Sequence, residues 1–208
     1  MTVFSRFLTV PTLAIAVVLS SPSLPVRAES AAAAIDSSVV VADLPEKKIN
    51  KTGLYVTAAD AIAAIGSRDD VLLVDVRSPE EAMFVGYATA TDILVPFKLV
   101  NPDHPYNAKK QIFGMMDNTD FVPQMKAFLA DKTPAAVLIM CRSGSRSAAA
   151  VDALVEAGVT APLYTVVDGF EGDKAGTGAR NVNGWKNAGG DWTYRIRADL
   201  MPQAPGTN

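Results

Sequence analysis

Cysteine and histidine are almost absent from this chain, which contains one of each, Cys141 and His104. Without a second cysteine, neither an intramolecular disulfide nor a dithiol redox cycle can form. His104 lies in a turn-rich segment with no cysteine or histidine motif around it, which argues against a metal ligand or a general base. Met115 and Met116 alone are too little for a copper site. We therefore expect no metal and no other cofactor.

Long apolar runs are also lacking. A membrane-spanning helix needs about 20 consecutive apolar residues, whereas the apolar stretch at residues 13–19 lies between Pro11 and Pro22. Residues 1–28 combine a short basic start, this stretch and small residues ending at Ala28, which is the pattern of a secretory signal peptide. The alternative is a membrane anchor. We expect cleavage near Ala28, export to the periplasm or otherwise out of the cytoplasm, and no membrane span afterwards.

An excess of basic residues is missing as well. The chain has 19 Lys and Arg against 22 Asp and Glu, and residues 1–28 carry two of the arginines and no acid. The mature chain would therefore have 17 basic and 22 acidic side chains and a net charge of −5. This balance argues against a nucleic-acid partner.

The chain shows no internal repeats and no heptads, and a mature length of about 180 residues suits one domain. Residues 29–51 lack a clear hydrophobic period, so we expect a flexible lead-in there. The organised pattern occupies residues 52–195. Within it, residues 98–117 have the composition of a loop-like insertion, and residues 196–208 form a C-terminal tail.

Apolar periodicity predicts alternating strands and helices within this domain. The predicted strands are residues 71–75, 93–97, 135–140 and 163–167. The predicted helices are residues 58–65, a helix starting at 78–81, residues 121–130 and residues 147–155. This alternation predicts an α/β fold with a central parallel sheet and helices on both faces, whose ligands gather at the carboxyl ends of the strands.

Cys141 lies at such an end, between the 135–140 strand and the 147–155 helix. A short Gly-containing loop at this place leaves several backbone N–H groups unpaired and directed at one spot, where an anion can bind. The same amides, the helix end and two arginines would favour an ionised thiol. We interpret Cys141 as a nucleophile in an anion-binding loop; the alternative is a small buried apolar residue.

Three motifs resemble the rhodanese-like sulfurtransferases over about residues 55–192. They are Asp75-Val76-Arg77 before an acidic helix start, Cys141-Arg142-Ser143-Gly144-Ser145-Arg146-Ser147, and Gly169-Phe170-Glu171-Gly172 followed by Trp185. Residues 183–194 are further similar to exported single-domain members of bacteria. The resemblance implies a rhodanese-like domain whose cysteine takes a sulfane sulfur from a donor such as thiosulfate. The cysteine holds it as a persulfide and passes it to a thiophilic acceptor such as cyanide or a protein thiol.

The residues of these motifs suit that chemistry. Cys141 would be the covalent nucleophile, and its loop would bind the substrate through Arg142, Ser143, Gly144, Ser145, Arg146 and Ser147. The guanidinium groups of the arginines offer paired N–H donors to the oxyanions of thiosulfate and of the departing sulfite. The backbone amides of the loop would stabilise the thiolate and the persulfide. Ser147 has an alternative role as a helix N-cap. We expect Asp75 and Arg77 to brace the loop rather than to react.

Several alternatives remain open. Many rhodaneses carry a His-Ile-Pro-Gly-Ala stretch, and Tyr87 stands at the position of its histidine here. Dual-specificity phosphatases of this fold place an arginine six positions after the cysteine, whereas Arg146 follows Cys141 by five. This shorter loop suits a sulfur species better than a phosphoryl group.

The partner would be a small sulfur-containing anion, with an exported protein as donor or acceptor. Alternatively, the chain is a sulfur carrier or anion-binding module that serves such a protein. The insertion would narrow the pocket or dock a partner.

Overall fold

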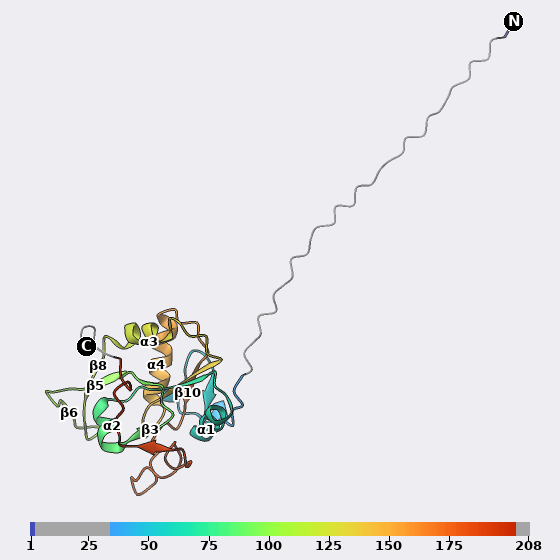
Figure 1. Ribbon diagram of the computed structural model, residues 1–208. Coiled ribbons are helices and arrows are strands. Elements are labelled where there is room, and N and C mark those ends of the chain that lie inside the picture. Colours follow the sequence, from blue (N-terminus) through green and yellow to red (C-terminus); the bar gives the residue numbers. More distant parts are fainter. Residues whose placement is uncertain (3–33, 203–208) are drawn as a thin grey trace. The chain divides into compact units, whose positions relative to one another are not determined.

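The computed structural model describes residues 1–2 and 34–202 (Figure 1). The predicted signal peptide falls, apart from its first two residues, outside the described residues. The start of the predicted lead-in and the end of the predicted tail also lie outside them.

Five parallel strands form the central sheet in the order β1-β10-β9-β2-β4. Their bounds are β1 (Tyr55–Val56), β10 (Leu163–Val166), β9 (Ala136–Met140), β2 (Val71–Asp75) and β4 (Ile93–Leu94). The central strand β9 pairs with β10 on one side and with β2 on the other, so that Ile139 is opposite both Thr165 and Val74. Every residue of β9 is buried, as its continuous apolar run predicts for a central parallel strand.

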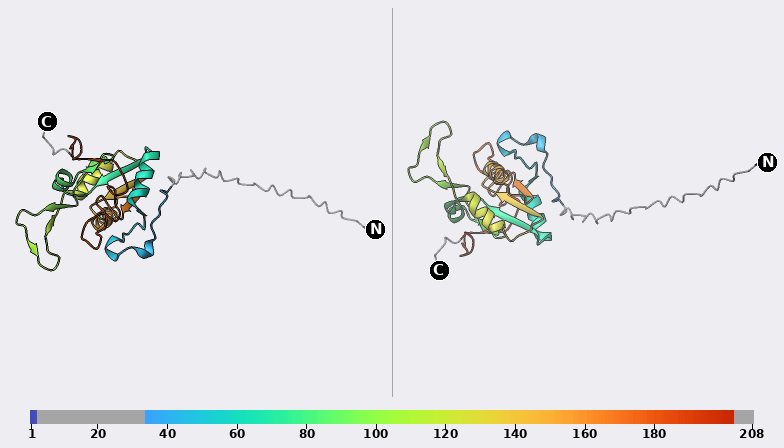
Figure 2. Two further views of the ribbon diagram at one scale, coloured as in Figure 1. Left: turned by 90° about the horizontal axis from the view of Figure 1, so that it is seen from below. Right: turned by 90° about the horizontal axis from the view of Figure 1, so that it is seen from above.

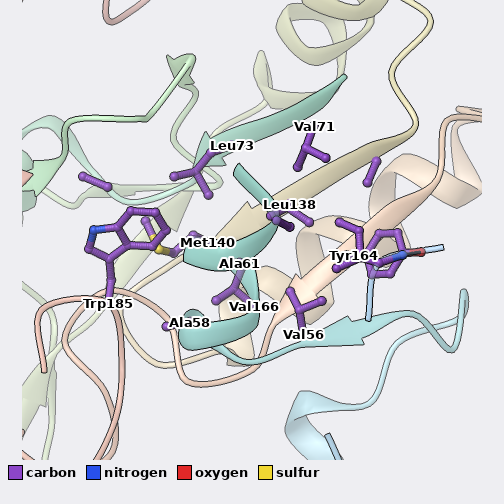
Figure 3. Close-up of a cluster of buried hydrophobic side chains, with 14 of the residues drawn as sticks. Val56, Ala58, Ala61, Val71, Leu73, Leu138, Met140, Tyr164, Val166 and Trp185 are labelled. Atoms are coloured by element: carbon purple, nitrogen blue, oxygen red, sulfur yellow. Dashed lines mark hydrogen bonds between the residues drawn. The ribbon is translucent and has the colours of Figure 1, made fainter. Parts of the chain in front are cut away.

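Helices cover both faces of this sheet, which confirms the predicted fold class. On one face, α1 (Ala58–Ser67) packs on Leu73, Leu138 and Met140, with Trp185 beside Met140 (Figure 3). On the other face lie α3 (Phe121–Leu129) and α4 (Ser145–Glu156). The short helix α2 (Pro79–Val85) follows β2. No helix in the described part of the chain combines the length and the apolar character needed to cross a membrane.

Local sequence signals explain where these helices begin. Thr57 caps α1 and Ser78 caps α2, each through a capping box with an acidic residue three positions later. Helix α4 begins two residues earlier than predicted, because Gly144 is its N-cap. The alternative role of Ser147 as N-cap is therefore wrong. Ser147 lies buried in the first turn, and its Oγ has no hydrogen-bond partner in the described part of the chain.

Residues 34–51 are packed against the domain, in contrast to the flexible lead-in that their composition predicts. They contain two single-turn helices, η1 (Val41–Asp43) and η2 (Glu46–Lys48). Lys48 is buried and its Nζ lies 2.9 Å from the Asp173 carboxylate, while the Asn50 amide donates to Thr165 Oγ1 at 2.8 Å. Because polar side chains make these contacts, hydrophobic periodicity does not reveal them.

The insertion at residues 98–117 forms two short antiparallel ribbons rather than a loop. Strand β5 (Lys98–Val100) pairs with β8 (Met115–Asp117), and β6 (Tyr106–Asn107) pairs with β7 (Ile112–Phe113). We call residues 98–117 the arm, because they project beyond the sheet (Figure 2). A further ribbon joins β3 (Tyr87–Ala88) to β11 (Trp192–Thr193). The edge strand β4 is covered by the C-terminal segment, where the Leu200 carbonyl accepts a hydrogen bond from the Leu94 N–H at 2.6 Å.

A buried ion pair follows β2. The Arg77 Nη2 lies 2.6 Å from Asp75 Oδ2, and both side chains are fully buried. Removing one charge from such a pair leaves the other without compensation in the interior. We expect Asp75→Asn to lower the free energy of unfolding by about 3–5 kcal/mol, measured by urea denaturation.

The exposed pair between Arg68 and Asp70 has the same sequence spacing and provides the control. Asp70→Asn should change stability little, because exposed ion pairs contribute little. Equal losses in the two variants would show that burial of Asp75 and Arg77 is not what makes their pair important.

Candidate active site

The single thiol lies at the carboxyl end of the central strand. Cys141 directly follows β9 and its side chain packs in the cluster formed with α3 and α4. The residue is 1% exposed, and its Sγ accepts a hydrogen bond from the Gly144 N–H at 3.2 Å. The sequence-based position of Cys141, between strand and helix in a short loop, is confirmed.

The orientation of this loop is set by residues 169–172. The Cys141 carbonyl accepts from the Phe170 N–H at 2.8 Å, and the Arg142 carbonyl accepts from the N–H groups of Glu171 and Gly172 at 3.0 and 3.2 Å. In a trans peptide the N–H points opposite to the C=O, so the amides that follow these carbonyls face away from residues 169–172. This arrangement leaves loop N–H groups available for an anion.

Most amides of the loop are in fact unengaged. Within residues 34–202, no acceptor receives a hydrogen bond from the backbone N–H of Arg142, Ser143, Ser145, Arg146 or Ser147. The last three belong to the first turn of α4, whose N-terminal end carries a partial positive charge. The loop therefore presents unengaged amides at the place where the sequence predicts that an anion binds.

Two glycines allow this close packing. Gly169 has φ +65°, and a Cβ built there would lie 2.4 Å from the Cys141 carbonyl oxygen. Gly144 has φ +95°, and its Cβ would lie 2.1 Å from the Val167 carbonyl oxygen. Both obstacles are backbone atoms, so neither can move aside without displacing the loop.

Arg146 is engaged by a carboxylate. Its Nη1 and Nη2 each donate to Glu81 at 2.6 Å, and the two side chains are 15% and 19% exposed. Burial opposes the ionisation of Glu81, but the hydrogen bonds from Arg146 hold its pKa below the ordinary value. Both terminal nitrogens of the Arg146 guanidinium thus donate to a carboxylate of the protein itself. This differs from the expectation that the guanidinium binds the substrate.

Arg142 is the more available arginine. Its side chain is exposed, and no hydrogen bond or ion pair within the described residues engages its guanidinium. It lines an open cavity of about 420 Å³, together with Arg146. Phe84 on α2 and Phe113 on the arm also line it. The arm therefore contributes to the lining of the cavity next to the loop.

The Asp75 and Arg77 pair supports the loop indirectly. The Arg77 guanidinium lies 4.0 Å from the centre of the Phe170 ring, and its Nη2 donates to the Gly86 carbonyl at 2.9 Å. Phe170 is one of the residues that hold the carbonyls of the cysteine loop. The pair is thus placed to brace residues 169–172.

The structure also places the other residues singled out in the sequence. Ser143 and Ser145 are partly buried in the loop. The Tyr87 hydroxyl donates to the Arg195 carbonyl at 2.9 Å, so it has a partner of its own. His104 packs against the Phe113 ring on the arm. Among the described residues, no group of three or more His, Cys, Asp or Glu side chains could hold a metal ion.

Sequence reasoning missed three contributors to the site. The sequence indicates Glu81 only as an acidic residue at a helix start, because its partner Arg146 is 65 positions away in the chain. Lys48 packs next to Gly144, from a segment without hydrophobic period. Arg180 donates to the Gly172 carbonyl, and burial together with the charge of Arg142 lowers its pKa. No local sequence signal indicates these contacts.

The glycine at position 169 offers a test of the loop support. Gly169→Ala should destabilise the protein by about 1–3 kcal/mol beyond its backbone strain, because the Cβ collides with the loop. Gly158→Ala is the control, since Gly158 has φ +81° and no atom lies within 4 Å of the place that its Cβ would occupy. Urea denaturation of both variants distinguishes the cost of the collision from that of the backbone strain. Equal losses of unfolding free energy in the two variants would contradict close packing at Gly169.

The ion pair of Glu81 predicts a pH dependence. Because its folded-state pKa lies below the ordinary 4.5, the stability it contributes is present above that pH and is lost as the pH falls through the folded-state value. Glu81→Gln should therefore be less stable than the wild type at neutral pH, with a difference that shrinks in acid. Denaturation curves recorded from neutral to acid pH measure the difference in unfolding free energy between the wild type and Glu81→Gln. A difference that does not change with pH would argue against the charged pair.

Comparison with known proteins places the chain among relatives. No family model matches it. The uncharacterised protein RP600 homolog of Rickettsia rickettsii is 31% identical over 129 residues, which cover 62% of this chain and 87% of the relative. The crystal structure of Rv0390 from M. tuberculosis is 31% identical with a TM-score of 0.51, and the match covers 67% of this chain and 96% of that one.

A thiosulfate sulfurtransferase structure from Pseudomonas aeruginosa is also similar, at 17% identity and a TM-score of 0.44 over 67% of this chain and 20% of that one. The relatives with 31% identity are matched over most of their own length. The chain belongs to the family that includes the Rickettsia protein and Rv0390.

Proposed function

We propose that this protein is a sulfurtransferase that moves a sulfane sulfur through a persulfide on Cys141. One observation carries the proposal: the Cys141 Sγ already accepts the Gly144 N–H, in a loop whose other amides are unengaged. Such amides stabilise a thiolate and, after transfer, the negative outer sulfur of a persulfide. The chain thereby has a nucleophile and a cradle for its anionic states in one place.

The first half of the cycle balances without an oxidant. The Cys141 thiolate attacks the outer sulfur of thiosulfate, a new S–S bond forms, and the S–S bond of thiosulfate breaks. Sulfite leaves with the electron pair. In the second half, a thiophilic acceptor such as cyanide or a thiol takes the outer sulfur and the thiolate is restored.

The charges around the loop support sulfur rather than phosphoryl transfer. Phosphoryl transfer needs donors around all equatorial oxygens of the phosphoryl group. Here Arg146 donates both ends of its fork to Glu81, and Ser147 is buried in α4. A small sulfur anion needs fewer hydrogen-bond donors from the loop, because the backbone amides and Arg142 at the cavity can hold it.

A carrier module is the second candidate. Its supporting observation is the burial of Cys141, which is 1% exposed. A persulfide formed at such a depth would be shielded from acceptors in solution and held until a partner protein exposes it. Because residues 1–28 predict export of this chain, the partner would also be an exported protein.

The proposal is tested by intact-mass spectrometry of the reduced protein after brief exposure to thiosulfate. We expect one sulfur atom to be added to the wild type and removed by cyanide. Because Cys141 is the single cysteine, the folded variant Cys141→Ser should gain none. Slow loading with a persulfide that resists cyanide would favour the carrier. No added mass on fully reduced wild type, or equal addition to Cys141→Ser, would overturn the proposal.

A further inference from the structure

The cavity beside the cysteine loop is larger and more apolar than an inorganic anion requires. Its volume of about 420 Å³ lies within the range of roughly 300–1,000 Å³ that is typical of sites for organic ligands. Its apolar lining comes from α2 and from the arm and consists of Phe84, Val85, Val100, Phe113 and Met115. Thiosulfate has no apolar part that could cover these side chains.

The two aromatic walls are open to solvent. Phe84 on α2 is 76% exposed, and Phe113 on β7 is 63% exposed. Large exposed apolar side chains that line one cavity indicate a surface that a ligand covers. A bound apolar group would remove both rings from water.

The charges of the cavity suit one anionic group. Arg146 is neutralised by Glu81, whereas no hydrogen bond or ion pair within residues 34–202 engages the Arg142 guanidinium. Arg142 directly follows Cys141 in the chain. Arg146 lines the same cavity, and although burial lowers its pKa, Glu81 and the charge of the Cys141 thiolate raise it. The cavity therefore reaches the surroundings of the thiol. The acidic Glu80 also lines the cavity, which disfavours a ligand with several negative charges.

We propose that the natural sulfur donor is organic: an anion that carries a transferable sulfane sulfur at one end and an apolar, preferably aromatic, group at the other. This inference rests on the proposed function. The anionic end lies at Arg142 and the loop amides, and the apolar group lies between Phe84 and Phe113. The arm, which supplies Phe113, then determines which donors bind well.

The chemistry is the same as with thiosulfate. For an organic thiosulfonate, the Cys141 thiolate forms a bond to the terminal sulfur, and the S–S bond of the donor breaks. The organic sulfinate leaves with the electron pair, so the step needs no oxidant or reductant. The proton of the thiol passes to solvent before the attack.

Benzenethiosulfonate and thiosulfate are suitable probes, because they transfer the same terminal sulfur. In benzenethiosulfonate a phenyl ring replaces one oxygen of thiosulfate, so the dianion becomes a monoanion. The variants Phe113→Ala and Phe84→Ala leave the charges of the protein unchanged and therefore report on the ring. We would measure kcat/KM for both donors with cyanide as acceptor. Phe113→Ala and Phe84→Ala should lower kcat/KM for benzenethiosulfonate about tenfold more than for thiosulfate, because an apolar contact contributes about this factor to discrimination. The loss should fall mainly on KM.

Each variant has a control on the same element. Ile112 precedes Phe113 on β7, and Met83 precedes Phe84 on α2; both are exposed and neither lines the cavity. Ile112→Ala and Met83→Ala should leave the ratio of the two donors unchanged. Since all four side chains are exposed, we expect all four variants to fold.

Two results would overturn the inference. One is an unchanged ratio of kcat/KM between the two donors in Phe113→Ala and Phe84→Ala. The other is an equal change of this ratio in the control variants Ile112→Ala and Met83→Ala. Failure of the proposed function is distinct, because then neither donor would load Cys141 with sulfur.

Discussion

Three backbone hydrogen bonds organise this site. They run from the N–H groups of residues 170–172 to the carbonyls of Cys141 and Arg142, and they turn the opposite edge of the loop, with its free amides, toward an anion. Everything that holds residues 169–172 in place therefore contributes to the site. Gly169 permits the contact, and Phe170 rests on the buried Arg77, whose charge Asp75 balances. The thiol chemistry thus depends on a backbone arrangement more than on any charged side chain.

The pairing of Glu81 with Arg146 changes how the electrostatics of the loop are understood. A motif with two arginines suggests strong attraction for a dianion, but one of the two is neutralised within the protein. The remaining attraction comes from amide dipoles, the first turn of α4 and the exposed Arg142. Selectivity is then left to the shape and lining of the cavity, to which α2 and the arm contribute the aromatic walls.

Much of this architecture could be predicted because the signals are local. The apolar run of β9, the caps Thr57 and Ser78 and the glycines of the loop each specify nearby backbone, and the α/β fold follows from their order. The insertion that forms the arm could be predicted, but its ribbons could not, because their strands are short and largely exposed. The contacts of the buried Lys48 and of the pair of Glu81 with Arg146 could not be predicted either, because polar side chains make them between segments far apart in the chain. Hydrophobic periodicity carries no information about such contacts.

The central claim is that the backbone amides of the loop, rather than the Arg146 guanidinium, hold the anionic outer sulfur of the persulfide. A crystal structure of the protein after loading with thiosulfate tests it most directly. The account predicts one added sulfur atom on Cys141 Sγ, within hydrogen-bond distance of the N–H groups of residues 143–147, and an intact pair between Arg146 and Glu81. An added sulfur bound by the Arg146 guanidinium, with Glu81 displaced and the amides directed elsewhere, would contradict it.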